Sequence, residues 1–320
     1  MDTLCIGVDI GGSTIKNGLF LSSGQLVYES KLPTPRNGNY QELLDSLANG
    51  VKELIMGANV LWSQVSAIGV GVPAFINFRE GIILHAPNLS LRNINLQKDL
   101  EKIWNKPVFI ENDANLAALG ETWLGAGNDS KHLMLVTIGT GIGCGIIIDN
   151  KIYHGSIGLA GEIGHMTIVH ENGRECTCGK TGCLETEVSA KAISIAAGKL
   201  ATRLKQGVLV DYYKKQGSIS SSFVIEQAKL GDIDCLNIIA DMGKILGSTL
   251  ANVATILNPE KILIGGGIAS VGNHLIVNIQ KGFKQQATPL IYQNTTIELA
   301  KLVNRAGITG AAKLALSNTK

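Results

Sequence analysis

The sequence predicts an α/β protein built from two lobes. Short apolar runs bounded by glycine or serine alternate with longer segments of helical spacing, which is typical of strands alternating with helices. The chain of 320 residues is long for one compact core, and 45% of its residues are hydrophobic. A pattern of strand, glycine turn, strand, turn and strand occurs twice, about 130 residues apart. The repeat indicates a duplicated module with one ligand site between the copies, although two unrelated hairpins would give the same pattern.

The first copy of this pattern opens the chain. Apolar runs of strand length are separated there by turns that contain glycine or serine. A segment with helical spacing follows, and two further apolar runs precede a second helix with a polar entry. The expected strands are Leu4–Ile10, Ile15–Leu21, Leu26–Tyr28, Ala67–Val72 and Val108–Ile110, and the expected helices cover residues 40–57 and 111–124.

The second copy begins after His132, where the turn Gly139–Gly143 takes the place of Gly11-Gly12. The remainder is mostly helical by periodicity, except for one late strand that runs into Gly265-Gly266-Gly267 and is followed by a helical segment. The expected strands are Leu133–Ile138, Cys144–Ile148, Ile152-Tyr153 and Ile262–Ile264, and the expected helices cover residues 189–205, 221–230 and 232–257.

Composition excludes several classes of protein. A net charge of +2, with lysine and arginine scattered along the chain, argues against a protein that binds nucleic acid by neutralising phosphates. The first residues lack a basic segment followed by an apolar one, so no secretory signal is expected. No apolar run approaches the roughly 20 residues that span a bilayer. Six cysteines without a signal indicate reduced thiols or a metal site. We therefore expect a cytoplasmic protein without nucleic-acid or membrane partners.

Three glycine-rich turns directly follow expected strands and are candidate phosphate-binding sites. Glycine lets backbone N–H groups approach a phosphate closely. None of the turns has the glycine spacing of a dinucleotide fingerprint. Gly179-Lys180-Thr181 fails the P-loop spacing, because Arg174 stands where the first glycine should be. The candidate turns are Asp9-Ile10-Gly11-Gly12-Ser13-Thr14, Gly139-Thr140-Gly141-Ile142-Gly143 and Gly265-Gly266-Gly267.

Asp9 closes the first of these expected strands. A carboxylate at the end of a buried strand is costly without a cation, and Mg²⁺, bound directly or through water, would supply one. The hydroxyls of Ser13 and Thr14 would add donors to phosphate oxygens. The alternative is that Asp9 only caps its own turn.

A cluster of one histidine and three cysteines predicts a structural zinc site. His165, Cys176, Cys178 and Cys183 match the ligand set of a closed tetrahedral site, and four protein ligands leave no open position for catalysis. His170 is a rival fourth ligand, and three free thiols in a loop are the alternative. The remaining cysteines lie in apolar segments and are expected to be buried: Cys5, Cys144 and Cys235.

Asp113 is the candidate proton acceptor. Asn112-Asp113 follows a strand and opens a helix, whose N-terminus favours an ionised carboxylate, although an aspartate at this place is commonly a helix cap. Glu162 and Glu185 flank the cysteine cluster, so bound metal would hold both carboxylates near one place. Several carboxylates and amides suit a ligand with many hydroxyls. Phosphoryl transfer needs such positioning groups, a cation and a carboxylate that orients the hydroxyl.

Together these motifs resemble the ROK family of sugar kinases (repressors, open reading frames and kinases). The segments that carry the resemblance span most of the chain in the family's order: Val8–Lys16, Glu111–Asn115, Gly139–Gly143, Gly161–His165, Cys176–Glu185 and Gly265–Gly267. The resemblance implies a ribonuclease H-like, actin/hexokinase-type duplicated fold, with ATP in the cleft between two lobes. The implied lobes are residues 1–119, to which a helix over 304–320 returns, and residues 120–303 with the zinc loop. A homodimer is also implied.

The resemblance also assigns roles to individual residues. Asp113 would be the catalytic base for transfer to a sugar hydroxyl, commonly the one on carbon six. Sugar hydroxyls would be held by Asn88, Asn112, Glu162, His165 and Glu185. ATP would be held by Asp9, Gly11, Gly12, Ser13, Thr14, Gly139, Thr140, Gly141, Gly265 and Gly266, with Gly265–Gly267 nearer the nucleoside.

Two departures from the family pattern bear on the sugar. Glucose kinases of the family often have Pro-Gly where this chain has Pro73-Ala74, and a tryptophan where it has Leu91. Glucose is the first expectation, and N-acetylmannosamine, allose, fructose and β-glucosides are further candidates.

Three rival functions stand beside the kinase. The family also contains sugar-responsive repressors with a helix-turn-helix ahead of the kinase-like part, for which a strand that begins at Leu4 leaves no room. Asp113 argues against a sugar-binding protein without catalysis. The closed ligand set of the cysteine cluster argues against a zinc-dependent hydrolase.

Overall fold

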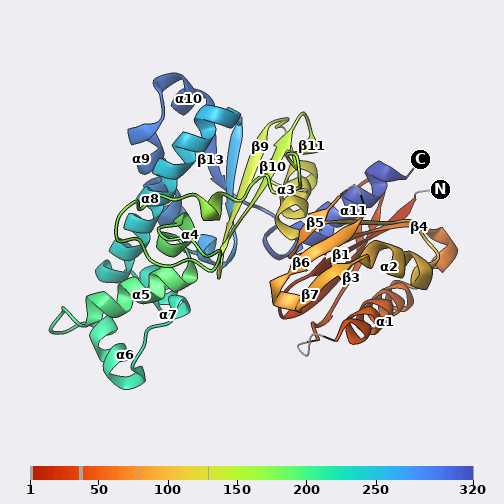
Figure 1. Cartoon of the computed structure of the whole chain (residues 1–320), viewed down its shortest axis with the longest axis horizontal. Helices are drawn as coiled ribbons and strands as arrows, with labels where there is room; N and C mark the ends of the chain where they lie inside the picture. Colours follow the sequence, from red (N-terminus) through yellow and green to blue (C-terminus); the bar gives the residue numbers. More distant parts are fainter. Residues whose placement is uncertain (1–2, 36–38, 79, 129, 320) are drawn as a thin grey trace. The chain divides into compact units, whose positions relative to one another are not determined.

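The computed structural model describes residues 3–35, 39–78, 80–128 and 130–319 (Figure 1). The chain forms two compact units. Unit 1 comprises Met1–Lys131, Gly145–Ala160 and Lys301–Lys320, and unit 2 comprises His132–Cys144 and Gly161–Ala300.

The first five-stranded sheet lies in unit 1 and has the order β3-β2-β1-β4-β8. The hairpin strands β1, β2 and β3 pair antiparallel, whereas β4 and β8 continue the sheet in parallel from β1. Asp9, near the end of β1, lies opposite Lys16 of β2. The strands are β1 (Leu4–Ile10), β2 (Thr14–Leu21), β3 (Leu26–Pro33), β4 (Val65–Val72) and β8 (Val108–Asn112).

Alternating residues of β1 face opposite sides of this sheet. Leu4, Ile6, Val8 and Ile10 join a core with the leucines of α1 (Tyr40–Ala58) and α2 (Leu96–Trp104). On the other side α11 (Ala306–Asn318) lies directly on Gly7 and Gly69, where a Cβ would overlap the carbonyls of Ile308 and Ala311. This helix also packs against α3 (Asp113–Leu124). Glycine in β1 and β4 therefore allows the last helix to close the core of unit 1.

A small antiparallel sheet, β5-β6-β7, also belongs to unit 1. It consists of β5 (Phe75–Asn77), β6 (Ile82–Ala86) and β7 (Leu91–Ile94). A single turn of 3₁₀-helix, Pro87–Leu89, joins β6 to β7 and carries Asn88.

The second five-stranded sheet has the order β11-β10-β9-β12-β13. It repeats the first sheet, because a hairpin series lies on one side of β9 and two parallel pairings, β9 with β12 and β12 with β13, lie on the other. The predicted duplication is therefore confirmed. The strands are β9 (Leu133–Ile138), β10 (Ile142–Ile148), β11 (Lys151–Ile152), β12 (Lys261–Gly265) and β13 (Thr296–Leu299).

Helices make up most of the rest of unit 2. The helices α8 and α9 pack closely at Gly247 and Gly282, where a Cβ on either glycine would overlap a backbone carbonyl of the other helix. The helices are α4 (Leu184–Glu187), α5 (Ala190–Ala201), α6 (Val208–Gln216), α7 (Ser221–Lys229), α8 (Ile233–Leu257), α9 (Asn273–Gln286) and α10 (Pro289–Asn294).

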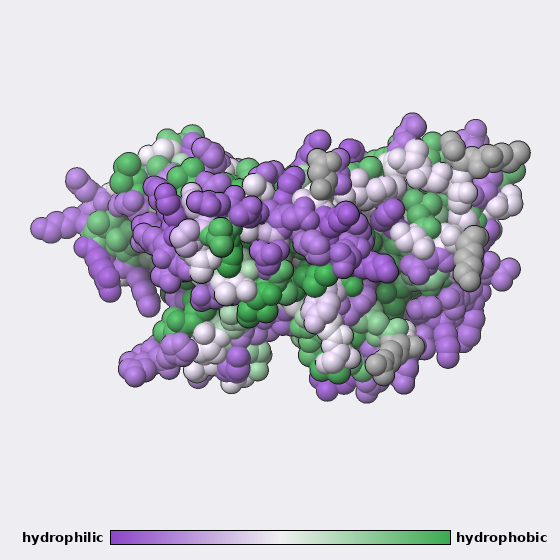
Figure 2. All heavy atoms as spheres, turned by 90° about the horizontal axis from the view of Figure 1, so that it is seen from above, coloured by the Kyte–Doolittle hydropathy of each residue, from purple (hydrophilic) through white to green (hydrophobic). Residues whose placement is uncertain are grey.

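Among the described residues, no helix has both the length and the apolar character needed to cross a bilayer. The visible face in Figure 2 is covered largely by hydrophilic residues, with hydrophobic atoms in patches between them.

Candidate active site and metal centre

Asp113 lies at the first position of α3, directly after β8. The side chain of Asn112 caps this helix, because its Oδ1 accepts hydrogen bonds from the backbone N–H groups of Ala114 (2.9 Å) and Asn115 (3.2 Å). Its Nδ2 donates to the carbonyl of Ala74 (3.3 Å). The Asp113 carboxylate accepts from the N–H of Ala114 (3.0 Å). The strand-to-helix junction therefore fixes the carboxylate.

Burial raises the pKa of the Asp113 carboxyl, and the backbone hydrogen bond from Ala114 opposes this rise only in part. The sequence predicts that the helix N-terminus favours the ionised form, and the hydrogen bond from Ala114 acts in that direction, against the larger effect of burial. A carboxylate with a raised pKa is a stronger proton acceptor than an exposed aspartate, which suits a general base.

Asp9 is a second partly buried carboxylate in the same unit, and its side chain is 17% exposed. Burial raises its pKa to about 6, the positive charge of Lys16 (3.9 Å) lowers it, and the negative charge of Asp113 raises it further. The carboxylate lies against the backbone of Gly307 in α11, where a Cβ would be 2.6 Å from its Cγ. Two carboxylates that repel each other in one buried region favour binding of a cation.

Replacing Asp9 by asparagine is expected to raise the free energy of unfolding at pH 7 by about 1–3 kcal/mol. Because the folded-state pKa lies above the ordinary 3.8, the folded protein binds more protons than the unfolded chain between these values. The stabilisation by the protonated form is therefore complete below about pH 4 and is lost as the pH rises through about 6. Urea denaturation should show little difference between the two proteins at about pH 4 and a clear one at pH 7. An equal difference at both pH values would contradict the assignment.

The glycine turn between β1 and β2 is tight and faces solvent. The N–H of Gly11 donates to the carbonyl of Thr14 (3.0 Å), and the hydroxyl of Thr34 donates to the carbonyl of Gly11 (2.7 Å). Gly12 and Ser13 are exposed, and a Cβ at Gly12 would meet nothing within 4 Å. A phosphate could therefore approach this backbone without steric hindrance.

In unit 2, the side chain of Glu185 contacts the turn Gly139–Gly143. Its Oε2 accepts a hydrogen bond from the N–H of Ile142 (3.0 Å), and a Cβ at Gly141 would overlap the same carboxylate. The structure thus brings a predicted sugar ligand into contact with a predicted phosphate turn. Gly266, which has φ +84°, packs on the backbone of Ile138 at the end of β9, so the third glycine turn lies beside the second.

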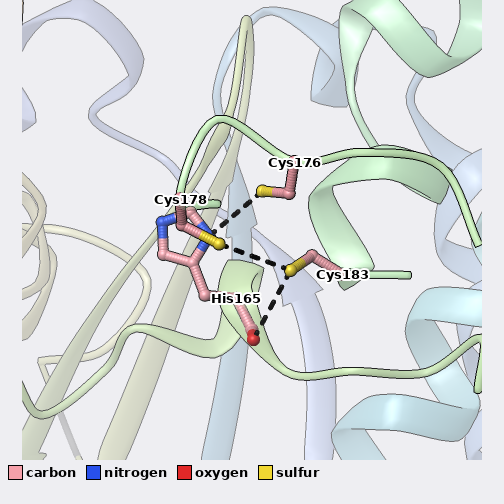
Figure 3. Close-up of side chains that lie close together, drawn as sticks. All are labelled: His165, Cys176, Cys178 and Cys183. Atoms are coloured by element: carbon pink, nitrogen blue, oxygen red, sulfur yellow. Dashed lines mark hydrogen bonds between the residues drawn. The ribbon is translucent and has the colours of Figure 1, made fainter. Parts of the chain in front are cut away.

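The four predicted metal ligands form one cluster in unit 2 (Figure 3). The ligand atoms of His165, Cys176, Cys178 and Cys183 all lie within 4.8 Å of one another. The Sγ of Cys176 lies 3.5 Å from the Nδ1 of His165, and the two other sulfurs lie 3.6 Å apart. Zinc–sulfur bonds of about 2.3 Å in a tetrahedron give separations of this size, so the donor set fits zinc. His170, the rival ligand, is exposed and outside this group.

The cluster also positions the acidic residues around it. Cys183 precedes the first turn of α4, and that turn carries Glu185. The other nitrogen of His165, Nε2, faces the carboxylate of Glu162 at 3.8 Å. A metal on Nδ1 would leave Nε2–H facing the Glu162 carboxylate, which resembles the arrangement of a carboxylate behind a histidine ligand. Metal binding would therefore orient Glu162 and Glu185 together.

The remaining predicted sugar ligands lie in unit 1. Asn112 and Asp113 are adjacent at the start of α3, and Asn88 is exposed on the turn between β6 and β7. Glu162, His165 and Glu185 lie in unit 2.

Two sheets of matching strand order, each with a glycine turn between the first two strands of its hairpin, define a protein with the actin/hexokinase-like fold. The chain belongs to the ROK family, whose family model matches residues 5–318. The resemblance inferred from the motifs is confirmed.

Relatives of this chain include enzymes and repressors. A glucokinase of Halalkalibacterium halodurans is 38% identical over 313 residues, which cover 98% of this chain and 95% of that protein. A xylose repressor of Caldicellulosiruptor bescii is 33% identical over 98% of this chain and 78% of the repressor. The solved structure of a ROK family glucokinase from Streptomyces griseus, in complex with glucose and AMPPNP, has a TM-score of 0.83 and 31% identity, covering 98% of this chain and 100% of that one.

Proposed function

We propose that this protein is an ATP-dependent hexose kinase that transfers the γ-phosphate to a sugar hydroxyl, with glucose as the first candidate and glucose 6-phosphate as its product. The observation that carries the proposal is the Asp113 carboxylate, which is partly buried, has a raised pKa and is fixed at the start of α3. The similarity to glucokinases along nearly the whole chain supports the sugar class.

Asp113 orients the attacking hydroxyl and accepts its proton late in the transfer. Asp9 is the residue that would hold Mg²⁺, directly or through water, because the cationic group of Lys16 lies as far as 3.9 Å from its partly buried carboxylate. Mg²⁺ would neutralise charge on the phosphates. The phosphates are bound by the glycine turns at Gly11–Thr14 and Gly139–Gly141, through backbone N–H groups other than those of Gly11 and Gly139, which donate within their own turns. The third turn, Gly265-Gly266, lies nearer the nucleoside.

The sugar hydroxyls are bound by two carboxylates, two amides and an imidazole, each at a position that matches the family motifs. The cap and the bond to Ala74 leave one amide hydrogen of Asn112 for the sugar. Zinc at the cysteine cluster would be structural, because the four side chains fill a tetrahedron. The sugar ligands are Asn88, Asn112, Glu162, His165 and Glu185.

A sugar-responsive regulator is the second candidate function, favoured by the similarity to xylose repressors. A kinase consumes ATP in proportion to sugar, whereas a regulator binds the sugar without turnover. We also infer a homodimer in the cytoplasm, which light scattering on the purified protein would test for its oligomeric state.

A coupled ATP assay across a hexose panel tests the proposal. We expect glucose to give the largest kcat/KM among glucose, N-acetylmannosamine, allose, fructose and a β-glucoside. A larger kcat/KM for another sugar would support the sugar kinase class but contradict glucose as the substrate. Sugar binding without turnover of any member would favour the regulator.

A further inference from the structure

Glu111 is a buried carboxylate beside the proposed base, and the mechanism above gives it no role. Its side chain is 2% exposed. Oε1 accepts hydrogen bonds from the N–H of Asn112 (2.9 Å) and from Nδ2 of Asn115 (2.9 Å). Oε2 lies 2.7 Å from Nε2 of His154. Glu111 therefore contacts the residue before Asp113 and a residue in the first turn of the helix that Asp113 begins.

His154 is the hydrogen-bond partner of the second oxygen of the buried Glu111 side chain. A buried carboxyl group is costly unless its oxygens are hydrogen-bonded, and Nε2 of His154 satisfies the oxygen that the backbone of Asn112 and the side chain of Asn115 leave free. The histidine side chain is 34% exposed, so the bond lies at the edge of the buried region.

The imidazole ring is itself held in place within unit 1. The ring of Phe78, directly after β5, lies 4.1 Å from it between centroids. Gly158, which has φ +84°, allows the segment after His154 to lie against Phe78, because a Cβ there would be 2.8 Å from that ring and from the carbonyl of Ile76. The N–H of Ala160 donates to the carbonyl of His154 (3.1 Å). These contacts fix the position of the imidazole ring independently of its hydrogen bond to Glu111.

We propose that Glu111 and His154 form a positioning pair that holds the Asn112-Asp113 junction in the geometry needed for proton transfer. Glu111 fixes the backbone of Asn112 and the side chain of Asn115, and Asn112 in turn caps the helix that begins at Asp113. The role rests on the proposed kinase function. A shift of about 1 Å at a reacting group can cost about 100-fold in rate, so a pair that touches no substrate can still control turnover.

The test compares two substitutions of His154 in the full-length protein. His154→Leu removes the donor, whereas His154→Gln keeps an N–H that can reach the carboxylate. We expect His154→Leu to lower kcat by about 10- to 100-fold with less than about a threefold change in KM for ATP, and His154→Gln to restore most of kcat. His274→Leu in α9 is the matched control, because it also removes a histidine hydrogen bond (to the carbonyl of Leu236) but lies in unit 2.

Hydrogen exchange gives a second readout that does not need catalysis. Amides over residues 111–116 should exchange at least about tenfold faster in His154→Leu than in the wild type, while those of α1, which packs on β2 and β3, stay unchanged. If the wild type had no kinase activity, the proposed function would be wrong. Hydrogen exchange would then test by itself whether Glu111 and His154 hold the Asn112-Asp113 junction. Unchanged exchange, no better turnover in His154→Gln than in His154→Leu, or an equal loss in His274→Leu would overturn the positioning role.

Discussion

Asp113→Asn is expected to lower kcat by about 10³-fold or more while leaving the fold and the sugar affinity close to wild type. The amide keeps the size of the carboxylate, and its oxygen can still accept from the N–H of Ala114. It cannot accept the proton of the sugar hydroxyl. Steady-state kinetics with isothermal titration of the sugar would separate the two effects.

Asp211→Asn in α6 is the matched control, because this aspartate is exposed and lies in unit 2. It should retain full activity. Wild-type turnover in Asp113→Asn would remove Asp113 from the role of base, and lost sugar binding with unchanged kcat would make it a binding residue only.

Cys178→Ser is expected to release the metal and to unfold the loop that leads into α4, which carries Glu185. The wild type should contain about one zinc per chain by elemental analysis, and the variant almost none. Binding of a structural zinc contributes on the order of 10 kcal/mol, which is comparable with the whole stability of a domain. We therefore expect a large fall in the thermal midpoint together with loss of sugar-dependent activity.

Cys235→Ala provides the control for loss of a thiol as such. Cys235 is buried at the start of α8 and is not among the clustered ligands. The Cys235→Ala protein should keep its zinc even if the lost side chain leaves a small cavity that lowers its free energy of unfolding. A stable, metal-free and fully active Cys178→Ser protein would refute the structural role of the cluster.

Strands that are apolar runs bounded by glycine were predictable residue by residue. Leu4–Ile10 and Leu133–Ile138 coincide with β1 and β9, because burial and turn chemistry agree there. The strand at Val108 runs further than predicted, to Asn112, since Glu111 and Asn112 pair with Gly71 and Val72 although their polar side chains resemble a helix entry.

Short elements that depend on tertiary support were not predictable. Periodicity did not reveal the small sheet β5-β6-β7, α10 or β13, because such brief segments carry too few apolar positions to show a period. The helices α2 and α6 were not predicted either, although Leu96, Leu100 and Trp104 of α2 have helical spacing. The helix expected over residues 304–320 is present as α11, from Ala306 to Asn318.

The candidate site likewise has features that the sequence predicts and features that depend on tertiary packing. The metal ligands were predictable from spacing, because the cysteines lie close along one loop. The bonds of Glu185 to Ile142 and of Glu111 to His154 each join residues 43 apart in sequence, and only packing brings them together. The raised pKa of Asp113 depends on burial, which a single helix start does not reveal.

The measurement that tests the central claim most directly is ³¹P NMR of the wild-type protein incubated with ATP, Mg²⁺ and glucose. The proposed function predicts one glucose phosphate for each ADP formed, with neither product when Asp113→Asn replaces the wild type. ADP formed without a phosphosugar, or no reaction with glucose or any other hexose of the panel, would contradict it.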